Sequence, residues 1–268
     1  MYHLVFFVEY FLYMHPVLVG VLVGFVVTQI AVFSTTLYLH RELTHKAVTF
    51  HPIINEIFRF AVWVTSGIRP RQWVAVHRKH HAHTDTVEDP HSPLVLGWKK
   101  VQLMNVFLYR KAANDKKTIE SYARDLPQRT TDRLFYDHAL LGLGLLFVGL
   151  VFSFGIIAAA VAFAFHAVLY LGLSGSVNSV AHHFGRKSYE TNSGTNVTWL
   201  ALLTAGEGFH NHHHAAPTSA RFSRRWFQAD PGWWVIKILS FLKLARIRHS
   251  DVDKLASKTP NPSHLAKI

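Results

Sequence analysis

The sequence contains no cysteine among its 268 residues. Zinc sites built on thiolates, cysteine-bound iron–sulfur clusters and disulfide frameworks are therefore excluded, and any metal ion must be held by imidazole or oxygen ligands. Acidic residues are scarce, with 16 Asp and Glu against 28 Lys and Arg, which gives a net charge of +12. Half of the residues are apolar, which argues against a disordered chain.

Lys and Arg are themselves missing from residues 1–40 and 134–185, and these two gaps contain long apolar segments. Residues 17–39 would extend about 35 Å as a helix, which is enough to cross a bilayer. The segment 139–177 is interrupted around Ser153 and Gly155 and is long enough for two helices joined by a turn. We therefore expect transmembrane helices at about 17–39, 138–153 and 156–177.

The basic residues flank these segments, and the positive-inside rule places both basic regions on the cytoplasmic face. We expect an all-α fold, an integral membrane helical bundle with about three to four spans. A single domain over 1–268 would include a cytosolic helical cap formed by about 40–137 and 178–268. Residues 1–16 lie in the interface or begin the first crossing. Segments 53–68 and 222–245 are predicted to be helices that lie on the membrane surface or are half buried. No nucleic-acid-binding motif is present, so no nucleic acid partner is expected.

The 20 histidines outnumber all acidic residues together. Two groups have the spacing i, i+3, i+4, which on a helix places three imidazoles on one face. The groups are His77, His80 and His81, and His210, His213 and His214. His40 and His45 are spaced i, i+5, about 140° apart on an α-helix, so both reach one point only if the helix ends or distorts near Arg41.

Asn178 and His182, one helical turn apart, follow the last predicted span. The predicted topology brings all four elements to the same face of the membrane. Taken singly, each has an ordinary explanation as a hydrogen-bonded or solvated group, but their agreement favours metal binding. Nine imidazoles and one carboxamide exceed the ligands of a single ion, so we expect a di-metal site, although imidazole alone does not select the metal.

Other histidines receive weaker assignments. His166 lies inside a predicted span, where a hydrogen bond within the bundle explains it. His83, His183 and His212 lie beside the groups and are candidates to support ligand rings, and His212 should point away from the face of His210.

Several motifs carry a family resemblance: HRELTH (40–45), WVAVHRKHH (73–81), EDPHSP (88–93), NSVAHHFG (178–185) and GEGFHNHHHAAP (206–217). The chain resembles membrane fatty acid desaturases of the stearoyl-CoA desaturase-like, delta-9 type from about Val17 to His249. Its segment 230–249 resembles the bacterial members.

The resemblance implies a site with two iron ions and a water-mediated partner, Asn178. The implied ligands are His40, His45, His77, His80, His81, His182, His210, His213 and His214. Trp73, one helical turn before His77, would line the substrate tunnel or else pack at the interface. The extra imidazoles at His83, His183 and His212 depart from the family pattern.

The implied reaction is the O2-dependent desaturation of a saturated fatty acyl chain, presented as a CoA thioester or linked to a lipid, with a cis double bond at delta-9. An unactivated C–H bond has no acidic proton, so a metal–oxygen oxidant is needed. The expected location is a bacterial cytoplasmic membrane, with the metal site facing the cytoplasm and in contact with membrane lipid. Because the sequence has no cysteine for a cluster and no fused haem domain, electrons should come from a separate donor such as a ferredoxin or flavodoxin-like protein.

Two other functions remain open at this point. The same di-iron centre would serve a fatty-acyl or lipid hydroxylase, in which a hydroxyl group returns to the substrate radical. A non-catalytic membrane metal-binding protein is the alternative from a different class, but its ligands should line a transmembrane path, whereas only His166 lies in the middle of a predicted span.

A first prediction concerns the basic surface, whose charge suits an acidic donor, anionic lipid or the phosphates of CoA. Its residues include Lys99, Lys100, Arg110, Lys111, Lys116 and Lys117. Reversing several of these lysines to Glu should slow turnover driven by the donor protein more than turnover driven by peroxide or dithionite. Equal slowing in both assays would exclude donor docking at this surface.

Overall fold

The computed structural model describes residues 15–258, so the expectation for residues 1–14 falls outside the described part. Two long helical stretches dominate it. Helix α2 (Pro16–Ser34) continues directly into a π-helix, η1 (Thr35–Thr44), and α8 spans Ala139–Asn178. The shorter helices are α3 (Pro52–Ser66), α4 (Pro70–Ala82), α5 (Pro93–Leu96), α6 (Trp98–Ala113), α7 (Lys116–Tyr122), η2 (Asp132–Tyr136), η3 (Val180–His182), α9 (Thr198–Leu203), α10 (His210–Ala215), α11 (Pro231–Phe241) and α12 (Val252–Ala256).

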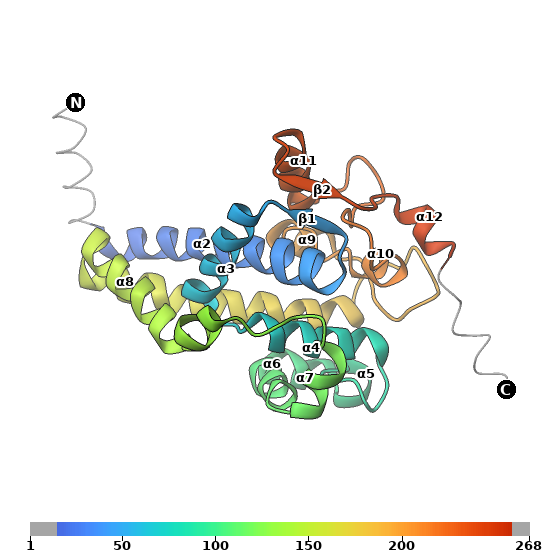
Figure 1. The fold of residues 1–268 in the computed structure, drawn as a ribbon, viewed down its shortest axis with the longest axis horizontal. Coiled ribbons are helices and arrows are strands. Elements are labelled where there is room, and N and C mark those ends of the chain that lie inside the picture. The colour runs from blue at the N-terminus through green and yellow to red at the C-terminus, as the bar shows by residue number, and fades with distance from the viewer. Residues whose placement is uncertain (1–14, 259–268) are drawn as a thin grey trace.

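Two helical segments, Pro16–Thr44 and Ala139–His182, are long and apolar enough to cross a membrane, with mean hydropathies of 2.4 and 2.6. Helix α8 breaks its helical geometry at Gly155, where φ is 80° and ψ is 163°. The rings of Phe147 and Phe163 meet across this break with centroids 5.7 Å apart. The two halves of α8 therefore form a hairpin beside α2 at one end of the molecule, and the shorter helices gather at the other end (Figure 1).

Small residues allow α2 and α8 to approach closely. A Cβ atom added to Gly20 would lie 2.7 Å from the carbonyl oxygen of Ala158, and one added to Gly24 would lie 2.7 Å from that of Ala162. Glycines four residues apart are typical of helix contacts in membranes, where close backbone packing replaces the hydrophobic effect.

The predicted helical fold is confirmed, and a small sheet is the one departure from it in residues 15–258. Strand β1 (Val48–Phe50) follows the first histidine motif and pairs antiparallel with β2 (Ala245–Ile247), with Thr49 opposite Arg246. Strands of three residues carry too little periodicity to be predicted from sequence. The pairing holds the C-terminal part of the cap against η1.

The predicted surface helices are only partly observed. Helix α3 matches its expected range, but the segment predicted at 222–245 becomes helical only at Pro231. Proline at the first helical position and the side chain of Asp230, which accepts a hydrogen bond from Trp233 N, fix the start of α11.

A buried ion pair connects this region to the histidine-bearing helix. Arg41 and Asp230 are completely buried, and Arg41 Nη2 donates to Asp230 Oδ1 at 2.9 Å. The guanidinium also donates to the carbonyls of Ala205 and Ala220 and lies 3.9 Å from the ring centroid of Phe222. The carboxylate accepts from the backbone N–H of Phe222 in addition. One ion pair thus joins η1 to three later segments.

We predict that Asp230→Ala lowers the free energy of unfolding by about 3–5 kcal/mol, because it leaves the Arg41 charge buried without a partner. Chemical denaturation of the detergent-solubilised protein measures this loss. The control is Arg129→Ala, which removes an exposed ion pair with Glu56 and should cost less than about 1 kcal/mol. Losses of equal size in the two variants would contradict the assigned role.

Candidate metal centre

The first histidine pair lies on the π-helix. His45 N donates to His40 O at 3.1 Å, an i→i+5 hydrogen bond, so the two residues are one π-helical turn apart. Their ring centroids are 4.9 Å apart. The distortion that the i, i+5 spacing required is therefore ten residues of π-helix, a rare geometry that is frequent at functional sites.

The second group lies on α4 and divides between two points. On an α-helix, i and i+4 are about 40° apart, whereas i+3 is about 60° from i on the other side. His77 and His81 accordingly turn toward each other, with Nε2 atoms 3.1 Å apart. His80 turns instead toward His214, with Nε2 atoms 3.3 Å apart.

The third group, on α10, divides in the opposite sense. His210 and His214, at i and i+4, bring their Nε2 atoms to 3.0 Å. His213, at i+3, faces the other cluster and approaches His81 with Nε2 atoms 2.9 Å apart. One group therefore gives two histidines to the first point and one to the second, and the other group gives one to the first point and two to the second.

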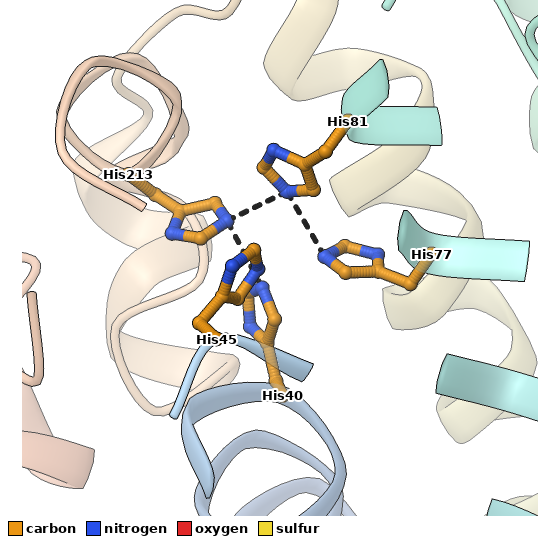
Figure 2. Close-up of side chains that lie close together, drawn as sticks. All are labelled: His40, His45, His77, His81 and His213. Atoms are coloured by element: carbon orange, nitrogen blue, oxygen red, sulfur yellow. Dashed lines mark hydrogen bonds between the residues drawn. The ribbon is translucent and has the colours of Figure 1, made fainter. Parts of the chain in front are cut away.

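The nine histidines predicted as ligands form two clusters whose candidate ligand atoms lie within 4.8 Å of one another. The five-histidine cluster draws on η1, α4 and α10, and Figure 2 shows its rings turned toward a common centre. The four-histidine cluster draws on α4, η3 and α10. Rings of His81 and His214 stack between the clusters at 4.4 Å. The five-histidine cluster contains His40, His45, His77, His81 and His213, and the four-histidine cluster contains His80, His182, His210 and His214.

Burial keeps these imidazoles in the form that binds metals. Desolvation, together with the repulsion that neighbouring imidazolium charges would exert, lowers the pKa of six cluster histidines well below the usual value. Uncharged rings at neutral pH offer a nitrogen lone pair. The six are His45, His77, His81, His210, His213 and His214.

Carboxylates hold the outer nitrogen of three rings. His40 Nδ1 lies 2.7 Å from Glu207 Oε1, and Thr36 Oγ1 donates to the same oxygen. His80 Nδ1 lies 2.9 Å from Asp89 Oδ2. A proton on Nδ1 that faces a carboxylate leaves Nε2 of that ring unprotonated and aimed into the cluster.

The third carboxylate, Asp85, is held by three side chains. Its Oδ2 lies 2.9 Å from His182 Nδ1 and also accepts from Ser193 Oγ, and its Oδ1 accepts from Ser92 Oγ at 2.8 Å. Burial alone would raise the pKa of Asp85, but these hydrogen bonds hold it well below the usual range. Its backbone has a positive φ of 59°, which Asp and Asn tolerate better than most residues.

The donor set fits two metal ions. Lone pairs from Nε2 of His182 and His210 face each other at 2.9 Å, and those of His40 and His213 at 3.0 Å. No carboxylate of the described residues belongs to either cluster, so a cation at each centre would satisfy lone pairs that otherwise oppose one another. Imidazole donors suit first-row transition metals.

Sequence analysis missed the three carboxylates as functional residues. Asp89 lies in the EDPHSP motif and Glu207 in GEGFHNHHHAAP, so both carboxylates belong to motifs that carry the family resemblance. His91, in the same EDPHSP motif as Asp89, is buried, and its ring stacks on His80 at 4.6 Å. An acidic residue close to a histidine motif was the available signal.

Of the two other predicted site residues, Trp73 contacts the five-histidine cluster and Asn178 contacts Asn105. Trp73 stacks on His77 at 4.8 Å and meets His40 edge-on at 5.9 Å. Asn178 ends α8, and its Nδ2 donates to Asn105 Oδ1 at 3.0 Å. The tunnel role of Trp73 and the water-mediated role of Asn178 stay predictions.

The histidines proposed as supports of ligand rings are placed elsewhere. His83 lies 2.8 Å from the Tyr122 hydroxyl, and His183 stacks against Trp98. His212 points away from both clusters as expected, with Nδ1 2.9 Å from Phe222 O. Carboxylates, whose charge suits an imidazole N–H, occupy the supporting positions instead. Within the bundle, His166 lies between Thr28 Oγ1 and Thr65 O, at 3.1 and 2.7 Å.

Comparisons with known proteins agree with this geometry. The family model described as fatty acid desaturase matches residues 14–239. The chain belongs to the fatty acid desaturase family. It is 36% identical over 249 residues to an acyl-CoA 5-desaturase of Anemone leveillei, an alignment that covers 88% of this chain and 71% of the relative.

Two other relatives show how the family varies. The chain is 34% identical over 214 residues to an sn-1 stearoyl-lipid 9-desaturase of Synechocystis, covering 79% of this chain and 65% of the relative. It is 30% identical over 226 residues to an icosanoyl-CoA 5-desaturase of Limnanthes douglasii, covering 80% and 60%. The family predicted from the motifs is confirmed, and the protein is a membrane-associated oxidoreductase that desaturates fatty acyl chains. The hypothesis of a non-catalytic metal-binding protein is therefore wrong.

We predict that Asp85→Asn weakens metal binding at the four-histidine cluster, because His182 loses a charged acceptor. Loss of such a carboxylate typically costs 10–100-fold in metal affinity. Metal content per chain after dialysis against a graded chelator should fall toward half that of the wild type. Glu88→Gln is the matched control, since Glu88 is exposed on the same loop. Full retention of metal by the Asp85 variant would contradict the proposed support of His182.

Proposed function

We propose that each of the two clusters would hold one iron ion and that the protein, supplied with O2 and two electrons, catalyses the loss of two hydrogens from adjacent methylenes of a saturated acyl chain. The single observation that supports this most strongly is the sorting of nine histidines from four chain segments into two adjacent clusters. Bound iron would supply the oxidising chemistry that an unactivated C–H bond requires. The balanced products are an alkene and two waters, with two protons taken up.

The residues of this chain would hold the ions, orient their ligands and exclude water. Glu207, Asp89 and Asp85 fix the rings of His40, His80 and His182. We propose all nine cluster histidines as direct ligands and Asn178 as a partner through water. Phe222 lies with its ring 4.7 Å from that of His213, and Trp73 covers His77, so both present apolar surface beside the five-histidine cluster. We propose that Trp73 lines the path of the acyl chain.

The substrate assignment rests on the relatives. Their names include acyl-CoA and acyl-lipid desaturases that act at position 5 or 9. We propose a saturated acyl chain bound to CoA or to a lipid, with a cis double bond introduced at delta-9. The cyanobacterial relative supports this position, and the two plant relatives make delta-5 the specific competitor.

Electron supply is proposed to come from a separate acidic donor such as a ferredoxin or flavodoxin-like protein. The six basic residues named above are exposed on α6 and α7. Helix α7 packs on α4, where Lys79 donates to Thr118 Oγ1 at 3.2 Å, and α4 carries three cluster histidines. A donor bound there would approach the clusters through α4. We propose that this face is cytoplasmic, in a bacterial cell membrane.

Expression in a host without its own aerobic desaturase tests the function. We predict a new monoene from the wild-type chain, with its double bond located by mass spectrometry at position 9, and none from His213→Ala. His249→Ala, which alters an exposed imidazole outside both clusters, should retain the product.

Other products would change the proposal in defined ways. A double bond at position 5 would replace the delta-9 assignment. Hydroxy acids would establish the hydroxylase alternative. Absence of any product from iron-loaded protein supplied with a working donor and both acyl-CoA and lipid substrates would contradict the proposed reaction.

A further inference from the structure

Helix α11 exposes a narrow apolar face. Trp234, Ile238 and Phe241 fall within an arc of about 60° and are 49%, 59% and 87% exposed. Ile236, on the opposite side, is completely buried in a cluster with Leu37 of η1. The helix is therefore apolar both on the side that packs against the protein and on the side that faces outward.

Helix α3 repeats the pattern at the same spacing. Ile53, Ile57 and Phe60 are 64%, 55% and 51% exposed, again at i, i+4 and i+7. Each helix also has a charged residue at i+3, Glu56 on α3 and Lys237 on α11. A long charged side chain beside an apolar arc can extend toward water while its stem stays on the apolar surface.

Helices α3 and α11 pack together close to the membrane-spanning part. Residues of α3 (Ile54 and Phe58) and of α11 (Trp233 and Leu239) pack on the same buried cluster around Leu37. Helix α3 also packs along both α2 and α8, the two candidate membrane helices. Helix α3 thus joins the buried cluster that it shares with α11 to the spanning helices.

The segment before α11 adds aromatic and basic groups. Trp226 and Phe227 are 91% and 69% exposed, with ring centroids 5.8 Å apart. Arg224 and Arg225 precede them directly. Exposed tryptophan beside arginine and lysine is typical of the boundary between lipid headgroups and hydrocarbon, and the cations suit anionic lipid.

We propose that this surface, named here the α11 face, lies in the headgroup region of the bilayer that α2 and α8 cross. It comprises Trp226, Phe227, Trp234, Ile238, Phe241 and Leu242. In Figure 1, α11 projects from the rest of the cap. The C-terminal part of the cap is then a second membrane-contact surface. Because α11 and η1 share one buried cluster, this contact would also fix the height of η1, with His40 and His45, above the bilayer.

The natural absence of cysteine allows a direct test on the whole protein. Single cysteines replace Trp234, Ile238 or Phe241, each carries a nitroxide spin label, and the protein is placed in nanodiscs that contain anionic lipid. Power-saturation EPR then compares collisions of the label with O2, which concentrates in lipid, and with a water-soluble nickel chelate. Val168→Cys on α8 serves as the lipid-facing reference and Lys254→Cys on α12 as the water-facing reference.

Labels on the α11 face should fall between the two references, with more O2 collisions and fewer nickel collisions than the Lys254 reference. Labels that match the Lys254 reference would overturn the proposal and leave the face open to a soluble partner. Labels shielded from both reagents, with dipolar broadening between spins, would overturn it in favour of a contact between two copies of the chain. The test does not depend on bound iron or on activity, so it stands apart from the proposed reaction.

Discussion

Hydrogen bonds between imidazole Nδ1 atoms and carboxylates fix the tautomer and the orientation of three rings at the site. Nine rings with inward-facing nitrogens would repel one another in a dry interior unless each kept one tautomer and one orientation. Asp85, Asp89 and Glu207 impose this on one ring each, and burial keeps six further rings uncharged. The scaffold of long helices, the small sheet and the Arg41–Asp230 pair hold the segments that carry these groups.

Backbone geometry allows four chain segments to supply all nine cluster histidines. The π-helix brings His40 and His45 onto one side of the helix. An α-helix would place these two residues about 140° apart. Each of the two histidine groups with i, i+3, i+4 spacing contributes to both clusters, because on a helix the side chain at i+3 points in a different direction from those at i and i+4. His182 alone comes from η3, and Asp85 supports it from a loop with positive φ. Strain and irregular structure therefore concentrate at the site, as is usual where function requires a fixed arrangement.

Local patterns in the sequence predicted much of this. Apolar length and the glycine interruption predicted α2 and the hairpin of α8, and histidine spacing selected all nine cluster residues. The division into five and four could not be predicted, since it depends on how α4 and α10 cross. The same holds for Asp89 and for the β1–β2 pairing, which join residues through tertiary contacts that leave no periodic signal.

The central claim is that each cluster holds its own iron ion. Anomalous diffraction from crystals of the iron-loaded protein, recorded on both sides of the iron absorption edge, tests this directly. We expect two separate peaks, one among His40, His45, His77, His81 and His213 and one among His80, His182, His210 and His214. A single peak shared by both clusters, or peaks that appear only at the zinc edge, would contradict it.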